Sequence, residues 1–277
     1  MKVIEPNAED SSQRELRADI HVAVKKADKV YILPKGGTIT AIRQIDLDIC
    51  RGEFISVVGP SGCGKSTLLK CVSGIAEITA GQIEVDGAKV TDPPDHMAIV
   101  FQRDILLDWR SVLDNILLPI EFKGHRKADW VGRASELLDL IGLKGFEQRR
   151  PWELSGGQRQ RVAICRALIQ EPRLLLMDEP FGALDALTRD ELNLELQRLW
   201  LASKKTVLFI THSIAEAVLL SDRVVVMAAN PGRIVETIPI DLPRPRTLDT
   251  RETPEFGHYA KIIRKRFEEL GVLRSKA

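Results

Sequence analysis

Residues 59–67 combine residue types that suit the binding of a phosphate group. Their sequence, Gly-Pro-Ser-Gly-Cys-Gly-Lys-Ser-Thr, stands between an apolar run at 54–58 and a segment at 68–72 with helical spacing. Glycines let backbone N–H groups close around phosphate oxygens, a helix start adds its positive dipole end, and a lysine can reach the β- and γ-phosphates of a nucleotide. We therefore predict a nucleotide-binding loop. It consists of Gly59, Pro60, Ser61, Gly62, Cys63, Gly64, Lys65, Ser66 and Thr67.

A pair of carboxylates ends another apolar run. Asp178 and Glu179 follow Leu-Leu-Leu-Met at 174–177, and an α/β sheet presents its ligands at the carboxyl ends of parallel strands. Such a pair alone is more often a solvated turn, but beside a phosphate-binding loop it indicates the chemical centre. Asp178 and the Ser66 hydroxyl suit a Mg²⁺-associated role, and Glu179 suits alignment or deprotonation of a water that attacks a γ-phosphate.

A second candidate anion site opens the helical run at 160–169. A serine and two glycines at a helix start can bind an anion through backbone N–H groups and the helix dipole. Simple capping of the helix by the serine is the alternative, but it does not explain the full Gly-Gly-Gln sequence. The residues of this site are Ser155, Gly156, Gly157 and Gln158.

Short apolar runs, alternating segments and one helical stretch predict an α/β fold that positions these residues. The runs at 54–58, 174–177 and 206–210 have the length of buried strands, and a helix at 186–202 between the last two implies a parallel sheet. Alternation predicts a strand pair within 20–33, a Gly36-Gly37 turn and a strand at 41–49, while the spacing within 114–142 is helical. A last strand pair is expected at 224–227 and 233–238, followed by an extended proline-rich piece at 241–246.

Composition limits the classes of protein that fit. The 277 residues carry 40 Lys plus Arg against 39 Asp plus Glu, so the net charge of +1 gives no support to nucleic-acid binding. No apolar run approaches the roughly 20 residues of a spanning helix, and residues 1–19 are polar and lack the apolar centre of a secretory signal. We expect those residues to be a flexible lead-in and the protein to stay in the cytoplasm. The four cysteines form no CxxC pair and are expected to be reduced.

With these motifs in this order, the chain resembles the ATP-binding subunits of ABC transporters over about residues 20–240. Three further positions match the pattern of that family: Gln102 in Val-Phe-Gln-Arg, Asp185 in Ala-Leu-Asp, and His212 in Ile-Thr-His-Ser. Tyr31 lies where the family places the aromatic residue that stacks on adenine, although core packing explains one aromatic residue in a strand equally well. The resemblance implies a P-loop ATPase core with an antiparallel β subdomain and a helical subdomain.

The resemblance also implies a mechanism with ATP and Mg²⁺. Two copies face head to tail, and each ATP lies between the phosphate-binding loop of one copy and the Ser-Gly-Gly-Gln segment of the other. Glu179 polarises water, His212 holds the γ-phosphate and Lys65 neutralises charge. Ser66, Gln102 and Asp178 bind Mg²⁺ in this mechanism.

Three classes of protein share this ATPase: transporter subunits, DNA-repair or chromosome ATPases, and translation factors. The repair proteins carry coiled coils or zinc cysteines within the ATPase, and the translation factors carry two cassettes, whereas this chain has one phosphate-binding loop and no such insert. The segments at 230–234 and 242–246 resemble the nitrate, sulfonate and taurine importer branch. This implies a homodimer at the cytoplasmic face of a bacterial membrane, separate permease subunits and, indirectly, a solute-binding protein.

The expected organisation is an ATPase domain at 20–243, with a helical subdomain at about 103–160, and a tail at 244–277. An amphipathic helix in the tail either packs on its own domain or contacts a membrane surface. Residues 103–122 carry more apolar groups than a small helical subdomain requires, and we expect part of them to receive a short permease helix. The apolar residues concerned are Ile105, Leu106, Leu107, Trp109, Leu113, Ile116 and Leu117.

Overall fold

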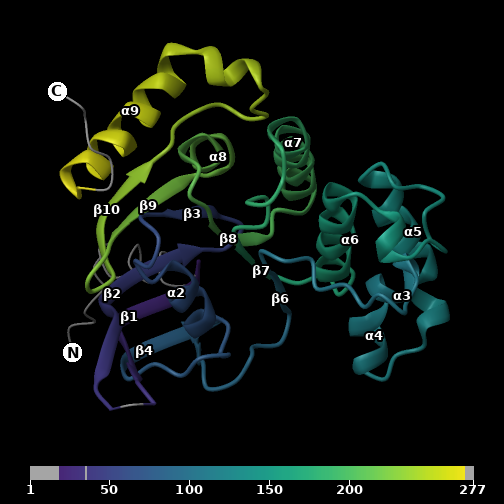
Figure 1. The fold of residues 1–277 in the computed structure, drawn as a ribbon, viewed down its shortest axis with the longest axis horizontal. Helices are drawn as coiled ribbons and strands as arrows, with labels where there is room; N and C mark the ends of the chain where they lie inside the picture. Colours follow the sequence, from purple (N-terminus) through teal and green to yellow (C-terminus); the bar gives the residue numbers. More distant parts are fainter. Residues whose placement is uncertain (1–18, 35, 272–277) are drawn as a thin grey trace, which may run out of the picture.

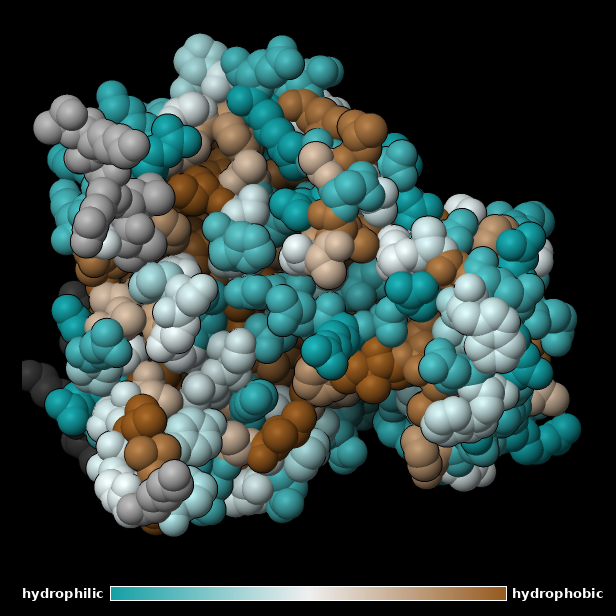
Figure 2. Space-filling model, viewed as in Figure 1, coloured by the Kyte–Doolittle hydropathy of each residue, from teal (hydrophilic) through white to brown (hydrophobic). Residues whose placement is uncertain are grey.

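The computed structural model describes residues 19–34 and 36–271, so the expected lead-in lies almost wholly outside the described residues. Two sheets and a separate group of helices make up this part of the chain (Figure 1). The surface in Figure 2 is mostly hydrophilic, and hydrophobic residues gather where the sheet-bearing part meets the helical group. Within the described residues, every helix is too short or too polar to cross a membrane.

A long antiparallel hairpin forms most of the smaller sheet. Strand β1 (Ile20–Ile32) pairs with β2 (Thr38–Cys50) and β4 (Ala80–Val85), which pairs in turn with the short β5 (Ala88–Lys89). The prediction of a strand pair within residues 20–33 is therefore wrong. The polar Lys25-Lys26 interruption is a bulge inside a single strand, where the register shifts and Lys26 adopts a left-handed φ of 46°.

Six strands form the larger sheet in the order β10-β9-β3-β8-β7-β6. The central strands are β3 (Phe54–Val58), β8 (Thr206–Ile210) and β7 (Leu174–Asp178), flanked by β6 (Met97–Val100) and β9 (Arg223–Ala228), all in parallel pairs. Strand β10 (Arg233–Pro239) is antiparallel to β9. The predicted parallel sheet and α/β fold class are thus confirmed.

Side chains of β3 pack into two hydrophobic cores, one on each face of the larger sheet. Ile55 and Val57 pack with α2 (Lys65–Val72) and the smaller sheet, whereas Phe54 packs with the helices of the opposite face. That face is covered by α6 (Gly156–Leu168), α7 (Ala186–Ser203) and α8 (Ile214–Leu220). Burial on both faces explains why these strands read as continuous apolar runs.

The helical group at the right of Figure 1 contains α3 (Val112–Ile116), α4 (Leu118–Phe122) and α5 (Val131–Leu140), together with α6. Two short 3₁₀ turns, Lys127–Trp130 and Pro151–Glu153, connect them. Asn115 is fully buried, and its amide donates to the carbonyls of Leu107, Arg110 and Ser111. The loop that follows Gln102 is therefore tied to this group by a satisfied buried amide.

The C-terminal part packs back on the larger sheet. A 3₁₀ turn at Asp249–Glu252 leads into α9 (Pro254–Glu269), whose Phe256, Ile263 and Phe267 are buried in a core shared with α8 and β9. The apolar face of this amphipathic helix is thus used for packing within the chain.

Arg246 lies in the extended piece before that helix and is only 2% exposed. Its guanidinium donates to the carbonyls of Val218 and Ser221 at 2.8 Å, and to those of Ile240 at 3.1 Å and Leu242 at 3.0 Å. Burial lowers the pKa of Arg246 to about 10. Because a helix leaves its last carbonyls without partners, this side chain acts as the C-terminal cap of α8.

Stability should depend on pH through His21, which is 2% exposed. Its Nδ1 lies 2.6 Å from the Thr206 hydroxyl and its Nε2 3.4 Å from Asp86. Burial, with Arg51 and Arg173, lowers the pKa below 6.5 although Asp86 opposes the shift. The unfolded chain therefore binds this proton more readily, and we expect the free energy of unfolding to fall below pH 6.5 by at most about 1.4 kcal/mol per unit.

Denaturant titrations between pH 5 and 8 check this expectation, with His21→Gln as the variant and the exposed His258→Gln as its matched control. The dependence should be weaker in His21→Gln and unchanged in the control. A dependence of equal slope in all three proteins would assign the effect to other groups.

Candidate functional site

The predicted phosphate-binding loop connects β3 to α2. Gly64 precedes the first residue of α2 with a φ of 92°, a left-handed conformation that favours glycine. A β-carbon there would lie 2.7 Å from the carbonyl oxygen of Ala41. The loop can therefore close against β2 only because this position carries no side chain.

Lys65 is the first residue of α2 and is 6% exposed. Its Nζ donates to the carbonyls of Gly59 at 2.9 Å and Pro60 at 3.1 Å, and lies 3.9 Å from Oε1 of Glu179. The ammonium thus stands between its own loop and the end of β7, where it can meet the terminal phosphates of a nucleotide.

Ser66 and Asp178 come together across the same cleft. The Ser66 hydroxyl donates to Oδ1 of Asp178 at 2.9 Å. Burial raises the pKa of Asp178, and the Ser66 hydrogen bond opposes the rise. A desolvated carboxylate beside a hydroxyl is an oxygen donor set that fits Mg²⁺, so these two residues suit the metal role predicted for them.

Three side chains converge on Glu179. Oε1 faces Lys65, while Oε2 lies 3.5 Å from Nε2 of Gln102 and 3.5 Å from Nδ1 of His212. Glu179 has a left-handed φ of 47°, and its N–H donates to the carbonyl of Ile210 at 2.9 Å. Its carboxylate is thereby held among an ammonium, an amide and an imidazole that come from three other parts of the chain.

All of these side chains except His212 line a cleft of about 390 Å³, within the range of small-molecule sites. Tyr31 lies opposite Ile39, which belongs to the wall, and is 38% exposed with Lys29 Nζ 4.9 Å from its ring centre. The lining residues are Ile39, Thr40, Ala41, Ser61, Gly62, Gly64, Lys65, Ser66, Thr67, Gln102, Asp178, Glu179 and Asn230. Asn230 was not predicted as a site residue, because the segment 230–234 was used only for the resemblance to the importer branch; it stands in the turn between β9 and β10.

The Ser-Gly-Gly-Gln segment forms a second group of site candidates, and its members do not appear in the described lining of the cleft. Ser155 caps α6: its Oγ accepts the N–H of Gln158 at 3.3 Å, and its own N–H donates to Oε1 of Gln158 at 2.9 Å. A β-carbon on Gly157 would meet Cγ2 of Thr188 at 2.4 Å. The start of α6 therefore packs closely on the start of α7, which Asp185 caps.

Glu216 is a buried carboxylate that sequence reasoning missed, since a lone glutamate in a helix reads as solvated. It accepts a hydrogen bond from the Thr211 hydroxyl and lies 3.7 Å from Nε of Arg189 on α7. Burial raises its pKa, and Thr211 and Arg189 counteract the rise. The Thr211 oxygen also accepts the N–H of Ser213 at 3.0 Å, so Glu216 fixes both residues that flank His212.

We expect Glu216→Ala to lower the maximal rate of ATP hydrolysis by up to about 100-fold, the cost of misplacing a group by about an ångström. Steady-state kinetics with a separate ATP-binding titration check this, and the nucleotide affinity should change little. Glu216→Gln, which still accepts from Thr211, should keep most of the rate. Equal losses in both variants would mean that the charge toward Arg189, rather than the Thr211 contact, positions the loop.

Comparison with known proteins shows the family of the chain. Residues 42–182 match the family model described as ABC transporter. The chain is 44% identical to the taurine import ATP-binding protein TauB of Rhizobium johnstonii, over 92% of this chain and 99% of TauB. It is 39% identical to the aliphatic sulfonates import ATP-binding protein SsuB of Bacillus cereus, over 92% and 98% of the two chains.

The fold also resembles that of a solved ABC transporter cassette. The dimeric structure of MJ0796, a bacterial ABC transporter cassette, matches with a TM-score of 0.71 and 32% identity, over 80% of this chain and all of the other. The chain belongs to the ABC transporter family. Both the family and the importer branch that the sequence resembles are confirmed.

Proposed function

We propose that this chain is the ATPase subunit of an importer for a small anionic or zwitterionic solute of the taurine, sulfonate and nitrate type. The relatives named above are import ATP-binding proteins that match almost from end to end, which does not favour the alternative of a DNA-repair or translation ATPase. The observation that carries the proposed chemistry is the convergence of Lys65, Gln102 and His212 on Glu179, beside the Ser66–Asp178 pair.

In this proposal ATP lies in the cleft with its phosphates against the loop at the start of α2. Lys65 and the N–H groups of that loop neutralise charge on the phosphates. Glu179 orients and polarises the attacking water, while His212 holds the γ-phosphate. Mg²⁺, when bound by Ser66, Asp178 and Gln102, would screen the phosphate oxygens. Phosphoryl transfer needs mostly such positioning and charge stabilisation.

The proposed active form is a head-to-tail homodimer. In the described chain the Ser155–Gln158 segment and Asp185 stand apart from the cleft, at the joined starts of α6 and α7. A second copy can place its own Ser155, Gly156 and Gly157 against the open side of the nucleotide. Each site then needs both chains, and hydrolysis releases the contact that holds them together.

We propose that the dimer works at the cytoplasmic face of the membrane with separate permease subunits, and indirectly with a solute-binding protein. To test this, the chain is purified with the permease encoded beside it and reconstituted in vesicles supplied with taurine, an alkylsulfonate or nitrate. ATP-dependent uptake of one of them is expected. ATP hydrolysis without any permease association would leave the ATPase intact and overturn the transport assignment.

The permease contact is proposed for the loop after Gln102. Ile116 and Leu117 are buried core, Leu106 and Leu113 pack against that core, but Ile105 is 53% exposed and Trp109 72% exposed. The carbonyl of Trp109 accepts a hydrogen bond from Arg150 at 2.7 Å, which fixes the backbone there. Trp109 thus presents an exposed aromatic group on a backbone that Arg150 holds, suited to receive a short helix.

Trp109→Glu is expected to abolish uptake and co-purification with the permease, because it buries a charge in that contact. Basal ATP binding should be unchanged, since the side chain is exposed in the isolated subunit. The matched control is Val235→Glu, an exposed apolar position on β10 that should leave association intact. Normal permease association of Trp109→Glu would remove this loop from the interface.

A further inference from the structure

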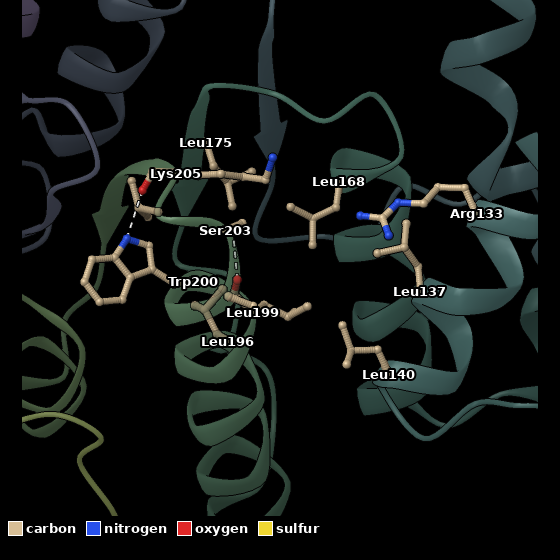
Figure 3. Close-up of a pocket in the computed structure, with 12 residues that line it drawn as sticks. Arg133, Leu137, Leu140, Leu168, Leu175, Leu196, Leu199, Trp200, Ser203 and Lys205 are labelled. Carbon is tan, nitrogen blue, oxygen red and sulfur yellow. Dashed lines mark hydrogen bonds between the residues drawn. The ribbon is translucent and has the colours of Figure 1, made fainter.

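A second cavity lies between the helical group and α7, away from the ATPase cleft (Figure 3). Its volume is about 290 Å³, close to the lower limit of about 300 Å³ for small-molecule pockets. The cavity is lined by Arg133, Leu137, Leu140, Leu168, Leu175, Leu196, Leu199, Trp200, Ala202, Ser203, Lys205 and Val207. Most of its wall is therefore aliphatic, and its ionisable lining groups are two cations.

The two cations approach one region of the cavity from opposite sides. Figure 3 shows Arg133 reaching in from α5 toward Leu168, and Lys205 entering from the loop between α7 and β8, with Leu168 between the two side chains. Burial is the main cause that lowers the pKa of Lys205; the Glu171 carboxylate opposes the shift, and repulsion from Arg133 adds to it. Both cations therefore line one cavity, where a bound anion can lie between them.

Among the described residues, no buried carboxylate forms an ion pair with either of these cations. Arg133 meets Glu136 at 3.0 Å and Glu171 at 3.6 Å, but both carboxylates are mostly exposed. Nε of Arg133, the atom that faces Glu171 at 3.6 Å, is buried and makes no hydrogen bond within the described chain. The Lys205 ammonium donates to the carbonyl of Pro172 at 3.1 Å, and among described residues it forms no ion pair within 4.0 Å.

We propose that this cavity binds an amphiphilic anion, a carboxylate or similar head group on an unbranched alkyl chain of medium length. The head lies between Arg133 and Lys205, and the chain lies among Leu137, Leu168 and Leu199. A charged head with an apolar tail fits because two cations face one region of the cavity and aliphatic carbon lines most of the rest. The bound molecule joins α5 to α7, the helix that Asp185 caps, and so links the helical group to the part of the chain proposed to face a second copy.

Titration calorimetry of the full chain with butanoate, hexanoate, octanoate and decanoate tests the proposal, below the concentrations at which they form micelles. Saturable binding is expected, with affinity rising about fourfold per added methylene until the chain fills the cavity. Octanol and octylammonium should bind at least about tenfold more weakly than octanoate. Equal binding of octylammonium, or non-saturable uptake of octanoate, overturns the proposal.

Two variants place the ligand in the cavity. Arg133→Gln should weaken octanoate binding about tenfold, whereas Arg126→Gln, an exposed arginine outside the lining, should not change it. Ala202→Phe fills the cavity from an exposed position and should abolish binding while the protein keeps its fold. If Arg133→Gln and Ala202→Phe both leave octanoate binding unchanged, the amphiphile binds elsewhere and the assignment is overturned. The absence of octanoate binding to the unaltered chain would overturn it too.

Discussion

Glu179→Gln is expected to bind MgATP about as well as the unaltered chain while hydrolysing it about 10²–10⁴ times more slowly, the usual contribution of a positioned general base. The substitution keeps the size of the side chain and leaves Lys65, Ser66 and Asp178 in place. It removes the negative charge that we propose polarises the attacking water. Because ATP then persists between two copies, the variant should accumulate as a dimer.

Single-turnover hydrolysis, calorimetric ATP titration and size-exclusion chromatography with and without ATP measure the three parts of this result. Glu171→Gln is a matched control, since that glutamate is exposed and outside the cleft. A turnover of Glu179→Gln close to that of the unaltered chain would remove this carboxylate from the mechanism. Loss of ATP binding would mean that Glu179 serves the nucleotide rather than the water.

Mixing two inactive variants should restore ATP hydrolysis if each site is shared between two chains. Lys65→Ala removes the cation proposed to face the terminal phosphates and should weaken ATP binding. Ser155→Arg places a bulky side chain at the start of α6. A heterodimer of the two has one site with both intact groups and one site with both defects, so activity returns in the first.

The mixing experiment requires evidence that heterodimers form, for example by pull-down of differently tagged chains. ATP hydrolysis in the mixture, above the sum of the two variants alone, is the expected outcome. Heterodimers without activity would contradict independent shared sites. That result would mean either that one chain supplies both Lys65 and Ser155 to a site, or that both sites must act together. Lys65→Ala mixed with itself and Ser155→Arg mixed with itself are the controls.

The larger sheet could be predicted from sequence because its strands are buried on both faces. Runs such as 54–58 and 206–210 show a buried strand directly, and the fixed spacing of the phosphate-binding loop places Lys65 and Ser66 at the following helix start. The meeting of Ser66 with Asp178 follows from topology, since β3 and β7 both pair with β8 and end at the same edge.

Other features could not be predicted, because they depend on contacts between residues that are far apart in the sequence. The lysines of β1 read as a break between strands, yet the N–H of Lys26 donates to Asp46 across the hairpin and the strand continues through a bulge. Arg246 reads as a solvated charge in a proline-rich piece, but its partners are carbonyls at the end of a helix about 25 residues earlier in the chain. Glu216 is likewise explained only by Thr211 and Arg189 in the folded chain.

The cap at Ser155 has a chemical consequence for the proposed dimer. Its Oγ uses a lone pair to accept the N–H of Gln158, and a hydroxyl keeps a proton of its own that it can donate at the same time. A carboxylate caps a helix equally well, but it has no proton to give and would repel a phosphate. One oxygen atom can therefore hold the helix in the isolated subunit and hydrogen-bond an incoming oxyanion, without exchanging one partner for the other when two copies close.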